Sequence, residues 1–444
     1  MRRVCVWVQA ELDGSDEYSV VGHEGVSMRR TSRRAAVILS LSALAATTAA
    51  CGSSGGTSSG HGGTITIGIL HPFTGNYAGV GAASLAGAKV AAKLINDAGG
   101  VLGKTLKIVT ADTLGDPADA VPALNKLLNI DHVSAVVGPG GLESGSTIPV
   151  LDRNHIPFML QAGDTAFDTM SDQYGFRTNP SDSQLSVAMA QFAHDKGYKT
   201  AAMVFSTIES AQTLKAPIEK TFKKLGGKIV ADVSLTPAQT SYSSEVLKVN
   251  DAHPDVIFTQ MEPPTGSVFF NAMAQTNNLS IPFIGSDITA GSDFISAVTT
   301  ARASKALYSL EGSSPANGAG SIFTKEYKVL EKATPLSNAN YAYDATIVLA
   351  LAIDAAKSTK GADIAAAISK VSSPPGTTVQ SYAAGLKALK AGKDINYDGA
   401  SGPMDLDSHH NVYGPFQVVQ SDAKGNPTVV ASLSAKELEA DSAP

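Results

Sequence analysis

Cysteine is nearly absent from this chain, whose 444 residues include only Cys5 and Cys51. Cleavage of an export signal before Cys51 would remove Cys5 and leave no pair that could form a disulfide. We therefore expect the fold to be stabilised by a large hydrophobic core instead of by disulfides, and 43% of the residues are hydrophobic.

Positive charge is not in excess either, because the formal net charge is −6. Without a basic face that also carries aromatic residues, the sequence does not predict binding to nucleic acid. Catalytic motifs of the GxSxG and HExxH types are also missing, and the nine histidines are scattered. We therefore predict a binding protein without cofactor or metal, and not an enzyme; a hydrolase that uses an Asp or Glu is the alternative.

The first fifty residues are typical of an export signal. From Met28 onward, four arginines precede the apolar run Ala35–Ala46, which is too short to span a bilayer stably. Ala49 and Ala50 come directly before Cys51, as in bacterial lipoprotein signals. We predict that 1–50 is a signal region with its true start at Met28, and that lipidated Cys51 anchors the protein to the outside of the cell membrane. Cleavage elsewhere, leaving a free thiol, is the alternative.

A linker and a strand–helix–strand unit follow. The Gly- and Ser-rich segment that runs from Cys51 to Gly63 is typical of a flexible tether. Thr64–Leu70 reads as a strand, and Ala82–Ala98 has apolar residues at helical spacing before Gly99 and Gly100 stop the helix. Leu106–Ala111 is the next strand, and the crossover makes the two strands parallel.

Strands and helices alternate along the rest of the chain, which predicts an α/β protein with mostly parallel sheets. Some 370 residues exceed what one core of this kind usually organises, so we expect two similar lobes.

The segments IGILHPFTG, GAKVAAKLINDAGGVLGKTLKIVTAD and GDPADAVPALNKLL resemble the opening of the branched-chain amino-acid binding proteins. These are extracytoplasmic solute-binding components of ABC importers and have the type I periplasmic binding-protein fold. The resemblance, which runs from about Thr64 to Leu433, implies two Rossmann-like lobes with parallel central sheets, joined by three hinge crossings.

The resemblance also implies where the lobes divide. We expect lobe 1 to comprise 64–181 and 312–402, lobe 2 to comprise 182–311 and 403–434, and 435–444 to form a tail. The crossings are expected near Pro180–Asp182, Glu311–Ser314 and Gly402–Asp407. We also expect a short strand at Met404–Leu406, just after the third crossing begins.

The function implied is capture of an amino acid or similar small polar solute between two closing lobes. The implied partners are an ABC permease and ATPase complex, and the membrane through the lipid anchor. A sensor of the same fold for amides, urea or aromatic acids is the alternative.

Two Gly-containing turns of lobe 1 are candidate ligand sites. The turn after Val133–Val137 contains Gly140, Gly141 and Ser144, and its backbone N–H groups suit a carboxylate. It lacks the spacing of nucleotide-binding loops, and a structural turn without ligand is the alternative. In the second turn, Gly163 and Thr165 match positions where the family holds the α-carboxylate of its ligand.

Lobe 2 and one loop of lobe 1 complete the predicted site. Asp287 follows a Phe-x-Gly strand end and matches the family's acidic partner of the ligand ammonium; capping of a helix near Ala290 is its alternative role. Glu262 and Ser210 stand where the family often has aromatic residues. Tyr77 is a candidate wall of the pocket or a lid over it.

One other segment resembles a calcium-binding motif. The spacing from Asp394 to Asp405 matches an EF-hand calcium loop, but its twelfth position is Asp instead of Glu, and Pro403 disfavours a following helix. His409 and His410 are too few for a zinc site.

Overall fold

A computed structural model of the protein describes residues 63–313, 317–435 and 437–438. The predicted signal region, the predicted lipidation site at Cys51, the linker up to residue 62 and the end of the tail lie outside these residues.

The first sheet is fully parallel and has the strand order β2-β1-β3-β4-β5. Its strands are β1 (Thr64–His71), β2 (Thr105–Asp112), β3 (Ala135–Gly140), β4 (Phe158–Gln161) and β5 (Gly175–Arg177). Ile65, Ile67 and Ile69 alternate along β1 into one core, and Gly68 leaves room for Leu127 on the other face, where a Cβ would lie 2.9 Å from the leucine. Both faces of this sheet are therefore buried, as expected of a parallel sheet.

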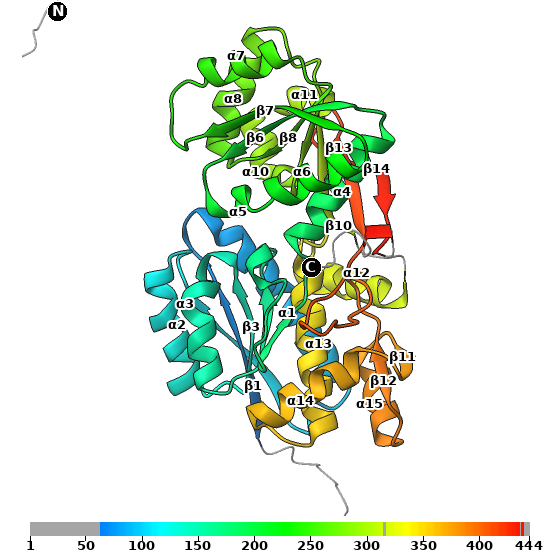
Figure 1. Ribbon diagram of the computed structural model, residues 1–444. Helices are drawn as coiled ribbons and strands as arrows, with labels where there is room; N and C mark the ends of the chain where they lie inside the picture. The colour runs from blue at the N-terminus through cyan, green and yellow to red at the C-terminus, as the bar shows by residue number, and fades with distance from the viewer. Residues whose placement is uncertain (1–62, 314–316, 436, 439–444) are drawn as a thin grey trace, which may run out of the picture. The chain divides into compact units, whose positions relative to one another are not determined.

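Helices cover both faces of the first sheet (Figure 1). They are α1 (Ala78–Asp97), α2 (Pro117–Asn129), α3 (Gly141–Arg153), α12 (Gly318–Glu331), α13 (Ala339–Ala356), α14 (Gly361–Ser372) and α15 (Tyr382–Lys390), with the 3-10 turns η1 (Gly75–Tyr77) and η2 (Thr165–Phe167). By length and composition α1 could also cross a membrane, but here it is a core helix packed on α13. At Gly87 a Cβ would lie 1.9 Å from the Ala339 carbonyl oxygen, so the two helices approach closely.

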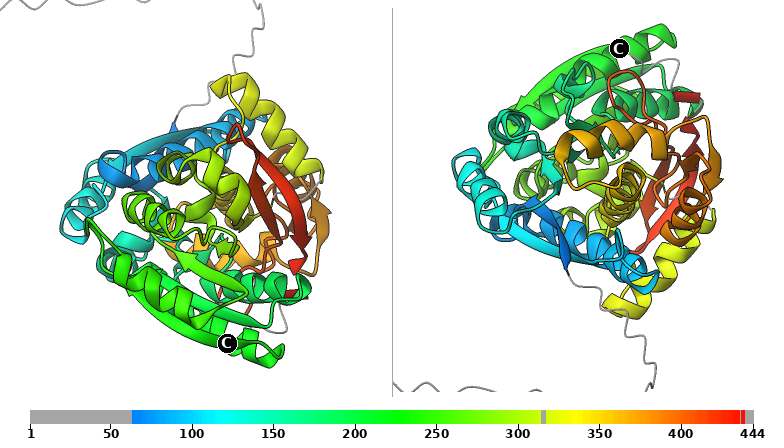
Figure 2. Two further views of the ribbon diagram at one scale, coloured as in Figure 1. Left: turned by 90° about the horizontal axis from the view of Figure 1, so that it is seen from above. Right: turned by 90° about the horizontal axis from the view of Figure 1, so that it is seen from below.

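The second sheet has the order β14-β13-β10-β9-β8-β6-β7. The strands β6 (Thr200–Ser206), β7 (Lys228–Leu235), β8 (Val256–Gln260), β9 (Phe283–Gly285) and β10 (Leu307–Gly312) are parallel, whereas β13 (Phe416–Ser421) and β14 (Pro427–Leu433) are antiparallel additions. Figure 2 shows β13 and β14 side by side in red.

Helices also cover the second sheet on both faces. They are α4 (Asp182–Asp195), α5 (Glu209–Gln212), α6 (Lys215–Lys224), α7 (Ser243–Ala252), α8 (Pro263–Gln275), α9 (Asp287–Ala290), α10 (Ser292–Val298) and α11 (Thr300–Ala306). The helices α5 and α6 are separated by Thr213 and Leu214. Helix α8 begins with two prolines, which fit the first helical turn because their missing N–H groups would have no partner there.

The chain passes between the two sheets three times. The first passage lies between β5 and α4, and the second between β10 and α12. The third comes later than the predicted Gly402–Asp407, because Met404 and Val412 still belong to the core of the first sheet and the Arg177 N–H donates to the His410 carbonyl. The first and third passages are in contact, because the Gly414 N–H donates to Gln184 Oε1 of α4 at 3.2 Å.

The strand predicted at Met404–Leu406 is wrong. Met404 is buried and the Leu406 N–H donates to the Ser373 hydroxyl, so this segment packs on α14 without joining a sheet. The short strand nearby is instead β12 (Ile395–Tyr397), which pairs with β11 (Thr377–Val379) beside α15 (Figure 1).

Candidate functional site

The carboxyl ends of β1, β3 and β4 lie next to one another, since these strands are parallel neighbours. In open parallel sheets this is the edge where ligands bind. Helix α3 begins there at Gly141, which is exposed; a Cβ at this position would meet only the Ala162 Cβ, at 3.9 Å. The first turn of α3 therefore presents backbone N–H groups to open space, and such a helix start favours an anion.

The neighbouring residues of this turn are less open than predicted. The N–H of Gly140 is buried and donates to Glu143 Oε1 at 3.2 Å. Ser144 is only 2% exposed, and its hydroxyl donates to the Gly141 carbonyl at 3.0 Å. Of the three residues predicted in this turn, only Gly141 faces open space in this conformation.

The second turn lies between β4 and β5 and contacts the first passage. The Asp182 N–H donates to the Gly163 carbonyl at 2.6 Å, and a Cβ on Gly163 would lie 2.1 Å from Asp182 Oδ1. A larger residue at this position would therefore require the Asp182 side chain to move. Thr165 opens the short η2 turn with a partly exposed side chain, and within the described residues its hydroxyl has no hydrogen-bond partner.

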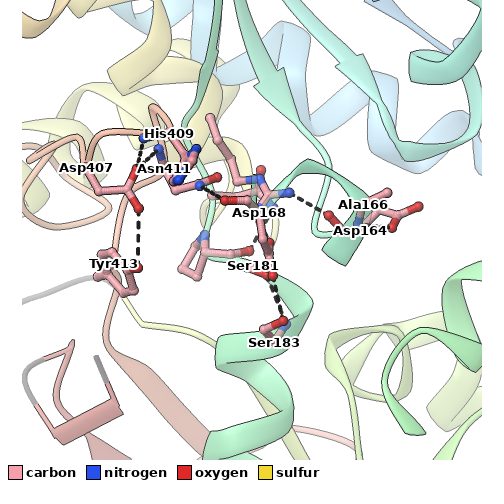
Figure 3. A network of polar contacts seen from close by, with 12 residues as sticks. Asp164, Ala166, Asp168, Ser181, Ser183, Asp407, His409, Asn411 and Tyr413 are labelled. Carbon is pink, nitrogen blue, oxygen red and sulfur yellow. Dashed lines mark hydrogen bonds and ion pairs between the residues drawn. The ribbon is translucent and has the colours of Figure 1, made fainter. Parts of the chain in front are cut away.

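A buried arginine holds the second turn, whose residues Asp164, Ala166 and Asp168 are labelled in Figure 3. Arg177 is the last residue of β5 and is fully buried. Its Nη2 donates to the Asp164 carbonyl at 2.6 Å, and its Nη1 donates to Asp168 Oδ1 at 2.7 Å. The Asp164 side chain in turn accepts the N–H of Ala166 at 2.8 Å. The backbone that carries Thr165 is thus attached to the sheet by a charged group.

The same network extends to two passages between the sheets (Figure 3). The hydroxyls of Ser181 and Ser183, at the start of α4, donate to the Asp168 carboxylate at 2.5 and 2.6 Å. From the third passage, Asn411 Nδ2 donates to the Asp168 carbonyl at 2.8 Å. Asp407 holds that passage by accepting from the N–H groups of His409 and Asn411. Asp168 therefore connects the second turn to the first and third passages.

Asp287 lies at the carboxyl end of β9, as predicted from the Phe-x-Gly strand end. It is the first residue of α9, and its Oδ1 accepts the Ile288 N–H at 3.0 Å. Burial raises the pKa of Asp287, the charge of Glu311 raises it further, and a hydrogen bond from Asn338 opposes both. The helix near Ala290 starts at Ser292 with Gly291 as its cap, so Asp287 does not cap it.

Asp287 and Asp182 are close enough to affect each other. Burial raises the pKa of Asp182 to about 8, and the charge of Asp287 is the next cause, whereas Arg177 lowers it. Arg177 forms its ion pair with Asp168, and its charge offsets only part of the rise in the pKa of Asp182. A cationic group placed between them would lower both pKa values and favour their ionised forms.

Glu262 of the second lobe and Tyr77 of the first are close enough for the charge of Glu262 to act on the Tyr77 hydroxyl. Glu262 precedes α8, and its Oε2 is buried without a hydrogen-bond partner among the described residues. Tyr77 lies in the loop after β1; burial raises the pKa of its hydroxyl, and the charge of Glu262 raises it further. Ser210 is exposed on α5, where Gln260 Nε2 approaches its hydroxyl at 3.5 Å.

In the described part of the chain, no group of three or more His, Cys, Asp or Glu side chains is arranged to hold a metal ion. The proposed EF-hand segment contains β12, and its Asp398 accepts a hydrogen bond from Gln380. His410 stacks on Phe176, and its Nδ1 lies 2.8 Å from the Gly175 carbonyl. These side chains have structural partners.

The structure therefore brings Gly163 and Asp287 close to Asp182, and Thr165 follows Gly163 by two residues in the same turn. The charge of Glu262 acts on Tyr77. Asp182 and Arg177 were not among the predicted site residues. A signal for Asp182 was its position directly after Pro180 and Ser181, at the predicted first crossing. Arg177 carried no signal, since a three-residue strand has no periodicity to recognise.

The sequence pattern of the periplasmic binding-protein family matches residues 64–426. The chain is 28% identical over 229 residues to a Leu/Ile/Val-binding protein homolog of Brucella abortus, an alignment that covers 50% of this chain. The chain thus spans 60% of the length of that relative. It is 26% identical over 357 residues to the substrate-binding protein BasB of a chemotactic signal transduction system in Halobacterium salinarum, covering 77% of this chain and 83% of that protein.

Among solved structures, the leucine-binding protein LivK of Thermotoga maritima has the same fold, with a TM-score of 0.71 and 20% sequence identity. The superposition covers 84% of this chain and 99% of that one. This likeness confirms the predicted fold class, with two lobes built on parallel central sheets.

Proposed function

The chain belongs to the periplasmic binding-protein family, and from that premise we propose that it is the solute-binding component of an ABC importer. Its cargo is an amino acid or a related small molecule that carries both a cationic nitrogen and a carboxylate. Proteins of this family bind and do not transform their ligands, so we propose no enzymatic activity; unchanged ligand after incubation with the protein is the expected result.

The observation that carries this proposal is the pair Asp182 and Asp287. The two carboxyl groups come from different elements, the charge of Asp287 raises the pKa of Asp182, and Asp182 lies beside the small residue Gly163. A buried carboxylate is stable when a cation or several hydrogen-bond donors accompany it, and an ammonium group supplies both. We propose that the ligand's amino group binds between Asp182 and Asp287.

The carboxylate at the opposite end of the ligand requires hydrogen-bond donors. The exposed start of α3 at Gly141 and the hydroxyl of Thr165 are both at the carboxyl edge of the first sheet. Backbone N–H groups at a helix start suit a carboxylate because they combine hydrogen bonds with the positive end of the helix dipole. The α-carboxylate is therefore assigned to Gly141 and Thr165.

Closure of the two lobes about the three passages would complete the site. The first sheet supplies Gly141 and Thr165, and the second supplies Asp287 and Glu262. The ligand favours the closed state because only that state allows contacts from both sheets. The permease would then recognise the closed form.

A thermal-shift screen of the purified chain, followed by calorimetry, tests this proposal. The panel contains α-amino acids, amides, urea, polyamines and aromatic acids. Asp287→Ala should weaken binding of the amino acid that gives a shift by about 1.5–3 kcal/mol, the range for a lost charged hydrogen bond. Asp293→Ala, on the exposed side of neighbouring α10, is the matched control and should leave the affinity unchanged. Equal affinities of the two variants would remove Asp287 from the site.

The similarity to BasB favours a second candidate, in which the protein reports its ligand to a signalling partner. Deletion of the gene distinguishes the two functions: an importer component is required for uptake of the labelled ligand, whereas a sensor is required only for the response to it.

We further propose that lipidated Cys51 anchors the protein outside the cell membrane. Incorporation of labelled palmitate that is lost in Cys51→Ala is the expected result. Equal labelling of both proteins would refute the anchor.

A further inference from the structure

A buried polar cluster lies directly under the turn Gly138–Gly141. His71 ends β1 and is fully buried, and Glu143, in the first turn of α3, is 1% exposed. The distance between His71 Nδ1 and Glu143 Oε1 is 3.6 Å. None of the assignments above gives either side chain a role.

The hydrogen bonds around His71 leave its ring nitrogen Nδ1 facing the carboxylate oxygen Oε1 of Glu143. Gln161 Oε1 accepts from the Ser84 hydroxyl and lies 2.7 Å from His71 Nε2, so Nε2 is the ring nitrogen that carries the proton. In a neutral imidazole, Nδ1 is then an acceptor, and it has no hydrogen-bond partner among the residues that the structure describes. It faces Glu143 Oε1, which is also an acceptor when the carboxyl group is ionised. One additional proton, taken from solvent onto either group, turns this repulsion between lone pairs into an attraction.

The cluster also contacts the backbone of the turn. The Gly140 N–H donates to Glu143 Oε1 at 3.2 Å. A Cβ at Gly140 would lie 3.2 Å from His71 Nδ1 and 3.4 Å from Glu143 Oε1, and one at Gly138 would lie 3.3 Å from His71 Nε2. A change of charge on Glu143 therefore alters its hydrogen bond with the Gly140 N–H. It also alters the electrostatic potential at the adjacent open N–H groups of α3.

We propose that His71 and Glu143 hold one proton between them and that, through this proton, Glu143 positions the Gly138–Gly141 turn for the carboxylate of the ligand. Glu143 is a positioning residue, since it acts through the turn and not on the ligand. The part of the inference that concerns the ligand rests on the proposed function, whereas the proton site and its effect on the turn do not.

Burial supports this assignment of the proton. It raises the pKa of Glu143 to about 7, with the hydrogen bond from Gly140 opposing it, and it lowers the pKa of His71 to about 4. Near neutral pH the shared proton is therefore on Glu143. The other polar side chains of the cluster are the neutral Gln161 of β4 and Ser84 of α1. The charged residues of the adjacent helix α2, which include Asp119 and Lys126, are exposed.

Ligand binding and protonation are then linked. A carboxylate that arrives at Gly141 is repelled by an ionised Glu143 and not by a protonated one. The ligand therefore raises the pKa of Glu143, and affinity falls as pH rises through about 7. Each unit by which the bound carboxylate raises that pKa weakens binding at high pH, relative to low pH, by about tenfold.

A ligand-free titration tests the proton site. The chain has two Pro–Gly steps, Pro139–Gly140 and Pro375–Gly376. Labelling with carbonyl-¹³C proline and ¹⁵N glycine therefore yields two selected amide signals. The Gly140 signal should titrate with a midpoint near pH 7, and the Gly376 signal, in the segment beside β12, should not.

Two variants locate the titrating group. Glu143→Gln keeps an oxygen that can accept the Gly140 N–H but cannot ionise, so the Gly140 signal should no longer titrate. Asp152→Asn is the matched control, because Asp152 lies in the last turn of the same helix and its pKa is also raised to about 7, by burial and by Asp172. The titration should persist in this variant. A Gly140 signal that is flat in the wild type, that titrates in Glu143→Gln, or that is flat in Asp152→Asn would overturn the proposal.

Calorimetry with L-leucine as the probe separates this inference from the proposed function. The dissociation constant should rise between pH 6 and 8 in the wild type and in Asp152→Asn, and it should stay constant in Glu143→Gln. A wild-type constant that does not change with pH would refute the link to the ligand. Absence of L-leucine binding at every pH would count against the proposed function for this amino acid, while the Gly140 titration still decides whether Glu143 controls the turn.

Discussion

Replacing Asp168 by alanine should destabilise the protein strongly, because its carboxylate accepts three side-chain hydrogen bonds. The donors are Arg177 Nη1 at 2.7 Å, the Ser181 hydroxyl at 2.5 Å and the Ser183 hydroxyl at 2.6 Å. Arg177 is fully buried and Asp168 is 13% exposed. Removing one partner of a buried ion pair costs about 3–5 kcal/mol, since the other charge is left without compensation. Because Asp168 is partly exposed, we expect the free energy of unfolding to fall by about 3 kcal/mol, the lower end of this range.

Urea denaturation of the wild type and the variant measures this loss as a change in the free energy of unfolding. Glu219→Gln is the control, because Glu219 pairs with Lys223 one helical turn away and both side chains are well exposed. Exposed pairs of this kind contribute about 0.3–0.5 kcal/mol. A loss below about 1 kcal/mol in Asp168→Ala would show that Arg177 does not depend on this partner, and the account of the network would be wrong.

Two further predictions concern buried acids. Asp344 accepts hydrogen bonds from the Tyr397 hydroxyl and from the N–H groups of Ala400 and Ser401. Asp344→Ala leaves these buried donors without a partner and should lower the free energy of unfolding by at least about 3 kcal/mol. A loss below about 1 kcal/mol in urea denaturation would contradict this prediction. Burial and the charge of Asp287 raise the pKa of Asp182 from 3.8 to about 8. The stability contributed by the protonated carboxyl is therefore complete below pH 4 and lost as pH rises towards 8. Asp182→Asn should show a smaller decrease in Tm between pH 4 and 8 than the wild type, and parallel curves would refute the assignment.

Regular elements could be predicted from the sequence because their signals are local. Helix α1 follows apolar spacing and ends where Gly99 and Gly100 adopt positive φ angles of 107° and 74°. The strands β1 and β2 were predicted for the same reason, since apolar runs mark strands buried in a parallel sheet, whereas the three-residue β5 was not predicted. The third passage was placed too early because nothing local shows that Val412 packs on the first core.

The candidate site was less predictable, since it depends on which polar groups meet in space. Ser144 appeared to be a ligand contact until the start of α3 at Gly141 turned its hydroxyl towards its own helix. Glu143 was not among the predicted site residues, whereas in the structure it accepts the Gly140 N–H and faces His71, which is 72 residues away in the chain. Contacts of such long range have no spacing that a sequence pattern can reveal.

The central claim is that Asp182 and Asp287 bind the cationic nitrogen of the ligand. Calorimetry with L-leucine and with 4-methylpentanoate, which has the same carbon skeleton but no amino group, tests it most directly. The account predicts that L-leucine binds, that 4-methylpentanoate binds at least about tenfold more weakly, and that this difference disappears in Asp287→Ala because the amino group has lost its partner. Equal binding of the two compounds by the wild type, or binding of 4-methylpentanoate alone, would contradict it.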